Sequence, residues 1–233
     1  MQEFNKDIRV KKLEIENRIL KKKLERSIEN RIAIEELLET HTIALRKRNE
    51  ELEEKSRQLK KLNKLNMFSA RHDYLTNLPN RLYFNEEMKR ISNDAETEIH
   101  TYSIIFIDLN GFKKINDTLG HDAGDTVLKS VAEKLKKCAG DTDIVSRFGG
   151  DEFVIMVKEY KTKDVIQRIC DHILQLLTVP VLIADRECIV GASMGVSFYP
   201  DDGTDFDDLL NKADDAMYEF KQTGKDGYMF MRT

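Results

Sequence analysis

The chain has 233 residues, enough for one domain of ordinary size and an additional segment. Charged residues make up 34% of it, and the net charge of −4 at pH 7 argues against a general nucleic-acid-binding protein. No apolar stretch approaches the roughly 20 residues that span a bilayer, and the N-terminus lacks the apolar core of a signal peptide. The cysteines, Cys138, Cys170 and Cys188, are few and far apart, so we expect no disulfide framework, no zinc site and a cytoplasmic location.

Residues 1–70 have the composition of one long helix, because they contain no Gly or Pro and are rich in Leu, Ile, Glu, Lys, Arg and Asn. One stripe recurs every seven residues, and a companion stripe lies three residues later in the first half. The stripes are Val10, Asn17, Leu24, Arg31, Leu38, Leu45, Leu52, Leu59 and Asn66, with companions Leu13, Leu20, Ser27 and Ile34. This pattern favours a coiled coil over a solvated single helix, and Asn17 and Asn66 favour a parallel two-stranded arrangement.

In the second half of this helix the main stripe can pair with either of two companion rows. The rows are His41, Arg48, Lys55 and Leu62, three residues on, and Thr42, Asn49, Ser56 and Asn63, four residues on. Neither row is strongly apolar, so neither register should dominate. The helix is therefore interpreted as a two-state signalling element, with a static dimerisation rod as the alternative.

From residue 71 to residue 233 the pattern is mixed and predicts a second domain. Apolar runs predict strands over 101–109, 152–158, 187–200 and 226–231, and helical spacing predicts helices over 124–140, 164–177 and 205–224. The stretch RFGGDEF joins two strands through a tight turn. We therefore predict an α+β fold with a largely antiparallel sheet and helices packed on it.

Two carboxylates lie at the ends of predicted strands. Asp108 ends the first strand, and Asp151 follows the turn formed by Gly149 and Gly150, whose freedom of φ lets the backbone approach a ligand closely. If the strands are neighbours, the two acids converge and need a cation between them. Oxygen ligands select a hard ion such as Mg²⁺. A solvated hairpin tip is the alternative that spacing alone leaves open.

A second group of polar residues follows Asp108. Lys113 is placed to reach a phosphate, and Asn116 can both donate and accept hydrogen bonds. The Asp125 carboxylate can accept two hydrogen bonds and matches the adjacent N1–H and 2-amino donors of guanine. The alternative is that Asn116 and Asp125 are ordinary cap and turn residues. Lys221 and Lys225 flank Gly224 near the end of the last helix, where they suit the helix dipole, a phosphate or both.

Six blocks in this order and spacing resemble the GGDEF-domain diguanylate cyclases. They are HDYLTNLPNR (72–81), DLNGFKKINDTLGHDAGD (108–125), GGDEF (149–153), ASMGVSFYPDDG (192–203), ADDAMYEFK (213–221) and GKDGY (224–228). The resemblance implies a central sheet of five strands flanked by helices, akin to the palm of polymerases and nucleotidyl cyclases. It also implies that two GTP molecules are joined into cyclic di-GMP with release of two pyrophosphates, in a homodimer held by the coiled coil.

The resemblance also implies roles for individual residues. Asp108, Asp151 and the Leu109 carbonyl would hold Mg²⁺, with Mn²⁺ as an alternative, and Glu152 would lie near the attacking 3′-hydroxyl as a metal ligand or proton acceptor. The residues expected to bind substrate are Asn116 and Asp125 at guanine, and Phe112 (through its backbone), Lys113, Gly149, Gly150, Lys221 and Lys225 at the triphosphate.

Three residues depart from the family pattern. Asn77 stands where Gly is usual, at a turn position that Asn tolerates. Lys225 stands where Arg is more usual, which keeps the charge but loses the bidentate fork. The inhibitory product site of the family is an Arg-x-x-Asp segment, and here Asp143 is present but Gly140 takes the place of the Arg. We therefore expect weak product inhibition.

Three other functions compete with this interpretation. A degenerate domain that only binds nucleotide is disfavoured by the intact Asp108, Asp151 and Glu152. A cyclase that makes cyclic GMP–AMP would replace the guanine-reading acid, whereas Asp125 is retained. The third alternative is a structural coiled-coil adaptor. Because the helix begins almost at the first residue, we expect any upstream sensor to lie on another chain, to have been removed or to be absent.

Overall fold

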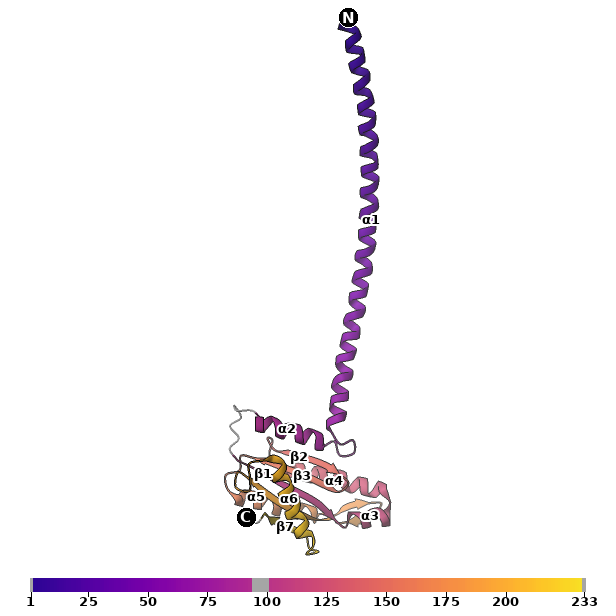
Figure 1. Ribbon diagram of the computed structural model, residues 1–233. Coiled ribbons are helices and arrows are strands. Elements are labelled where there is room, and N and C mark those ends of the chain that lie inside the picture. The colour runs from indigo at the N-terminus through magenta and orange to yellow at the C-terminus, as the bar shows by residue number, and fades with distance from the viewer. Residues whose placement is uncertain (1, 94–100, 232–233) are drawn as a thin grey trace. The chain divides into compact units, whose positions relative to one another are not determined.

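The computed structural model describes residues 2–93 and 101–231. The chain divides into two compact units, Met1–Lys64 and Leu65–Thr233. The first unit belongs to one helix, α1 (Gln2–Arg71), which confirms the long helix predicted at the N-terminus (Figure 1). The leucines of α1 whose burial is described are more than half exposed, Leu38 by 59% and Leu45 by 64% for example, so this described part of the heptad stripe is not covered within one chain. The side chain of Val10 lies outside the described residues.

The second unit is built on a five-stranded sheet in the order β2-β3-β1-β6-β7. The bounds of these strands are β1 (Tyr102–Asn110), β2 (Ile144–Gly149), β3 (Glu152–Lys158), β6 (Gly191–Tyr199) and β7 (Gly227–Phe230). All neighbouring pairs are antiparallel except β6 and β7, which run parallel. The predicted α+β class and the mostly antiparallel sheet of five strands are thus confirmed.

Two apolar cores cover the two faces of the sheet. On one face, Ile105 and Ile155 pack with α3 (Phe112–Leu119), α4 (His121–Cys138) and α5 (Lys163–Leu177). On the other face, Ile104 and Val154 pack with α2 (Arg81–Asn93) and α6 (Phe206–Lys221). Successive residues of a strand point to opposite faces, so a strand covered on both faces is apolar throughout.

The structure corrects several sequence-based boundaries. The strand predicted over 187–200 is two strands, because β5 (Arg186–Cys188) leaves the main sheet to form a hairpin with β4 (Val181–Ile183). The helix predicted over 124–140 begins earlier, at His121, and α2 and α3 were not predicted. Within residues 2–93 and 101–231, no helix combines the length and the apolar character needed to cross a bilayer.

The backbone of α6 packs closely on the sheet at Gly195 of β6. A Cβ atom there would lie 2.0 Å from the carbonyl oxygen of Ala213 and 2.2 Å from the amide nitrogen of Met217, both in the backbone of α6. A backbone cannot yield as a flexible side chain does. The absence of a side chain at Gly195 therefore sets how closely α6, which carries Lys221, packs on the sheet.

We expect Gly195→Ala to lower the free energy of unfolding by about 3 kcal/mol, because it forces α6 away from β6. Urea denaturation measures the change. The control is Gly140→Ala, whose added Cβ meets only the Asp143 side chain at 3.3 Å and should change stability by less than about 1 kcal/mol. Equal stability of the two variants would contradict the proposed backbone contact.

Candidate active site

Asp108 lies near the end of the central strand and has a cross-strand neighbour on each side. In the sheet it stands opposite Glu152 of β3 and opposite Ser193 of β6. Asp108 is only 6% exposed, and the next residue, Leu109, donates its N–H to the carbonyl of Asp151 at 3.2 Å. The register of the sheet thus brings the three predicted acids, Asp108, Asp151 and Glu152, to one edge.

The charges at this edge are unevenly compensated. Burial raises the pKa of Asp108, as does the nearby Asp151, while the ammonium of Lys221 at 2.5 Å opposes the rise. Burial also raises the pKa of Glu152, and the neighbouring carboxylates of Asp214, Asp108 and Asp151 add to it. A concentration of acids with raised pKa values favours a bound cation, because a cation removes their mutual repulsion.

Two further charged residues belong to this edge and were not predicted. Asp214 of α6 has a raised pKa because of burial and the charges of Asp215 and Asp108. The Arg81 guanidinium opposes the pKa rise at both Glu152 and Asp214, and it lies over the Phe148 ring at 5.4 Å. Both residues fall inside sequence blocks that the resemblance had marked, 72–81 and 213–221, which was the available signal.

The donor set fits a hard divalent cation that retains other ligands. Within the part of the chain that the structure describes, no three His, Cys, Asp or Glu side chains are gathered as a ready-made metal centre. A Mg²⁺ ion bound to a nucleotide needs only one or two protein carboxylates, because phosphates and waters fill the remaining positions. The positive charge beside Asp108 is at present supplied by Lys221.

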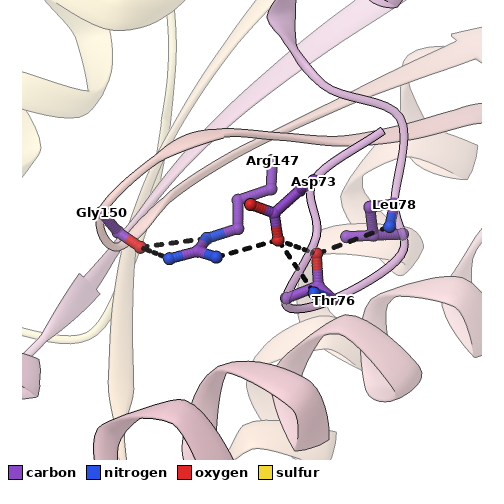
Figure 2. Close-up of polar contacts among 5 residues, drawn as sticks. All are labelled: Asp73, Thr76, Leu78, Arg147 and Gly150. Atoms are coloured by element: carbon purple, nitrogen blue, oxygen red, sulfur yellow. Dashed lines mark hydrogen bonds and ion pairs between the residues drawn. The ribbon is translucent and has the colours of Figure 1, made fainter. Parts of the chain in front are cut away.

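The turn that carries the acids is held by Arg147, whose guanidinium lies between Gly150 and Asp73 (Figure 2). Gly150 has φ of +49°, in the left-handed region that favours glycine. Its carbonyl accepts two hydrogen bonds from the Arg147 guanidinium, at 3.1 Å from Nε and 2.7 Å from Nη2. The third arm, Nη1, forms an ion pair with Asp73 at 2.9 Å, and both side chains are largely buried. Arg147 therefore joins the turn of the GGDEF segment to the segment that follows α1.

Asp73 organises the turn that follows α1. Its Oδ1 accepts hydrogen bonds from the backbone N–H and the hydroxyl of Thr76, at 2.9 and 2.6 Å, as well as from Arg147 (Figure 2). The backbone carbonyl of Asp73 accepts a hydrogen bond from the N–H of Asn77 at 2.9 Å. Asn77 has φ of +57°, a conformation that Asn adopts more readily than most residues, so Asn suits this turn position.

The residues expected at guanine lie on two helices that pack together, Asn116 on α3 and Asp125 on α4. A Cβ at Gly124 would lie 1.9 Å from Oδ1 of Asn116, so the Asn116 amide fills the space above this glycine, next to Asp125. Phe112 is buried beside them, with its Cζ 3.2 Å from the same point. Lys113, on α3, and Lys225, after Gly224, are both exposed, whereas Lys221 contacts Asp108.

Asp143 has a local structural use. One carboxylate oxygen accepts the N–H of Gly140 at 2.7 Å, and the other accepts the N–H of Lys158 at 3.0 Å. The carboxylate therefore closes the turn between α4 and β2 and ties it to β3. The expectation of weak product inhibition, based on the missing Arg, stays a prediction.

We expect Asp73→Asn to destabilise the fold by about 2 kcal/mol at pH 7, because the largely buried guanidinium of Arg147 loses the negative charge that it pairs with. Burial alone raises the Asp73 pKa, but hydrogen bonds from Thr76 and Arg147 outweigh it and the pKa is lowered from 3.8. The stabilisation is therefore complete above about pH 3.8 and is lost as the pH falls through the folded-state pKa.

Urea denaturation of both proteins between pH 7 and pH 3 tests this, with Asp141→Asn, at an exposed position, as the control. The stability difference should be constant at neutral pH and should shrink at the acidic end. A difference that grows on acidification would contradict the assigned ion pair.

The comparisons with known proteins agree with this geometry. The chain is 34% identical to the bifunctional diguanylate cyclase/cyclic di-GMP phosphodiesterase MucR of Pseudomonas aeruginosa, over 70% of this chain and 24% of that protein. The first five curated relatives are longer proteins, of which this chain spans 20% to 36%.

Solved structures give the same result. The GGDEF domain of TpbB from Pseudomonas aeruginosa superposes with a TM-score of 0.66 at 34% identity, covering 69% of this chain and 94% of that one. The coiled coil and GGDEF domain of DgcB from Caulobacter crescentus, solved with c-di-GMP, shares the fold with a TM-score of 0.73 at 24% identity, covering 80% and 98%. The family model described as "Diguanylate cyclase, GGDEF domain" matches residues 70–227. The chain belongs to the GGDEF-domain family of diguanylate cyclases.

Proposed function

We propose that this protein is a diguanylate cyclase that condenses two GTP molecules into cyclic di-GMP and two pyrophosphates. The observation that carries the proposal is the convergence of Asp108, Asp151 and Glu152 at one sheet edge, inside the segment that matches the family model. We place the enzyme in the cytoplasm, since Cys138, Cys170 and Cys188 are all free thiols.

In this proposal Asp108, Asp151 and the Leu109 carbonyl hold a divalent metal, Mg²⁺ or alternatively Mn²⁺, and Glu152 lies beside the attacking hydroxyl. Bound there, the metal stabilises the charge that develops on the phosphate and the leaving group. The burial of Asp108 supports this assignment, because a buried carboxylate beside other acids gains most from a cation.

The substrate groups are assigned to two neighbouring regions. Asn116 and Asp125 read guanine, and the position of the Asn116 amide against Gly124, next to Asp125, supports a joint recognition site. The triphosphate is assigned to a larger set of groups: the Phe112 backbone, Lys113, Gly149, Gly150, Lys221 and Lys225. Lys221 would exchange its contact with Asp108 for a phosphate oxygen.

The chemistry explains why two copies are needed. A 3′-oxygen attacks an α-phosphate, its proton leaves towards Glu152, and the bond to pyrophosphate breaks. One domain holds one GTP, so each 3′-hydroxyl must attack the α-phosphate held by a second domain. Orientation of the two nucleotides supplies much of the rate enhancement in such a reaction, and a single domain cannot supply it.

We expect the protein to convert GTP to cyclic di-GMP in the presence of Mg²⁺, and Asp151→Asn and Glu152→Gln each to lower turnover at least about 100-fold, because each removes a charge at the reacting phosphate. Chromatography of the product measures this, and circular dichroism checks the fold.

The matched control is Asp185→Asn, which removes one exposed acid from the β4–β5 turn and should leave turnover unchanged. Cyclic GMP–AMP formed from mixed ATP and GTP would favour the alternative nucleotide specificity. Full activity of either active-site variant would overturn the assignment of the acids.

We also propose that α1 pairs with a second copy and sets how the two catalytic domains face each other. The exposed stripe supports this, since Leu38, Leu45, Leu52 and Leu59 would each be buried in a two-stranded coiled coil. A signal that shifts the register by a few kcal/mol would be enough to change the population of the productive arrangement. An upstream sensor is a suitable source of such a signal.

Variants that force each register of the coiled coil in turn test whether α1 controls activity. One variant carries Leu at positions 41, 48 and 55 and the other at positions 42, 49 and 56, and we expect both to be dimeric but to differ several-fold in GTP turnover. A third variant with Ala at 41, 48 and 55 removes the same charges without an apolar seam. Equal turnover in the two Leu variants would contradict the switch and would indicate that the helix is a static dimerisation rod.

A further inference from the structure

A space left by a missing side chain lies beside β1, two residues beyond Asp108. Asn110, the last residue of β1, stands directly opposite Gly191, the first residue of β6. The cross-strand partner of Asn110 therefore has no side chain, and the space beside Asn110 is open to another part of the chain.

The side chain of Asp226 occupies this space over Gly191. A Cβ at Gly191 would lie 1.7 Å from Oδ1 of Asp226 and 2.2 Å from its Cγ, so the carboxylate rests directly on the glycine backbone. Asp226 belongs to the loop between α6 and β7, and it comes from a part of the chain 116 residues away from Asn110.

The Asn110 amide is oriented by partners on both sides. Its Oδ1 accepts a hydrogen bond from the Ser193 hydroxyl at 3.1 Å, and Ser193 is fully buried. Its Nδ2 donates to Oδ1 of Asp226 at 2.9 Å and to the carbonyl of Lys225 at 3.4 Å. A carboxylate in place of this amide has no hydrogen to donate and would repel Asp226.

The loop held in this way carries Lys225, the exposed lysine assigned to the triphosphate, and it follows Lys221, which contacts Asp108. Gly224, between them, has φ of +66° and gives the loop a sharp bend. An exposed lysine on a short bent loop can serve one phosphate reproducibly only if the loop backbone is fixed.

We propose that Asn110 is a positioning residue that fixes the Lys225 loop against the metal-binding end of β1 through Asp226. The inference rests on the proposed function, because the substrate is taken to be a nucleoside triphosphate. Asn110 and Asp226 form a complementary pair, in which one side must donate and the other must accept.

The complementarity gives a test by exchange. Asn110→Asp places two carboxylates in contact, and we expect it to weaken binding of 3′-deoxy-GTP with Mg²⁺ about tenfold, measured by calorimetry, and to raise the KM for GTP by a similar factor with little change in kcat. The double variant Asn110→Asp with Asp226→Asn restores one donor and one acceptor, and it should recover affinity to within about threefold.

Two further variants separate positioning from net charge. Gly191→Ala should displace Asp226 without changing any charge, and it should weaken 3′-deoxy-GTP binding as Asn110→Asp does. Asn211→Asp adds the same charge at an exposed position of α6, about 15 Å along the helix from Lys221 at 1.5 Å per residue, and should leave binding unchanged.

Hydrogen–deuterium exchange of residues 222–227 supplies a readout that does not need turnover. The hydrogen–deuterium exchange rate should rise several-fold in Asn110→Asp and in Gly191→Ala. It should return to the wild-type rate in the double variant Asn110→Asp with Asp226→Asn. If the wild-type protein fails to turn over GTP, the proposed function fails while exchange still decides the role of Asn110. The proposal would be overturned if both single variants kept the wild-type hydrogen-exchange rate. It would also be overturned if the double variant exchanged as fast, and bound 3′-deoxy-GTP as weakly, as Asn110→Asp alone.

Discussion

The pairing of β1 with an antiparallel strand on each side is the constraint on which the rest of the site depends. It places Asp108 opposite Glu152 and Ser193 at once, and Asn110 opposite Gly191. A slip of one residue on either side would turn each of these side chains to the other face of the sheet. Because β1 is buried on both faces, its apolar residues fill two cores and fix the register that the polar residues at its end require.

This arrangement explains why much of the fold and the acids could be predicted. The strand at 101–109 is a continuous apolar run, and GGDEF is a short turn before another such run, so both strands and the hairpin turn could be predicted from pattern alone. The pairing of the two strands with each other was only a condition of the argument, and the structure supplies it. The role of the acids could not be predicted from pattern alone. Spacing left a solvated hairpin open, and only the resemblance assigned Asp108 and Asp151 to a metal, an assignment that stays a proposal.

What could not be predicted depends on contacts distant in sequence. Arg147 and Asp73 are separated by 74 residues, and the guanidinium reaches the Asp73 carboxylate only once β2 and the segment after α1 lie together. The β4–β5 hairpin was missed because it continues into the next apolar run without a Gly or Pro break before Gly191. Side chains that act on a neighbour's backbone leave no periodic signature in the sequence.

The uneven charge of the active-site edge has a consequence for which form of nucleotide arrives there. The carboxylates of Asp108, Asp151, Glu152 and Asp214 influence one another, and the opposing charges named beside them are Lys221 and Arg81. If the ligand is a nucleoside triphosphate, as proposed, its uncomplexed form is a polyanion that would be repelled by this edge, whereas a nucleotide already paired with a cation would be repelled far less. The acidic edge would thereby act as an electrostatic filter on the ionic form of that ligand.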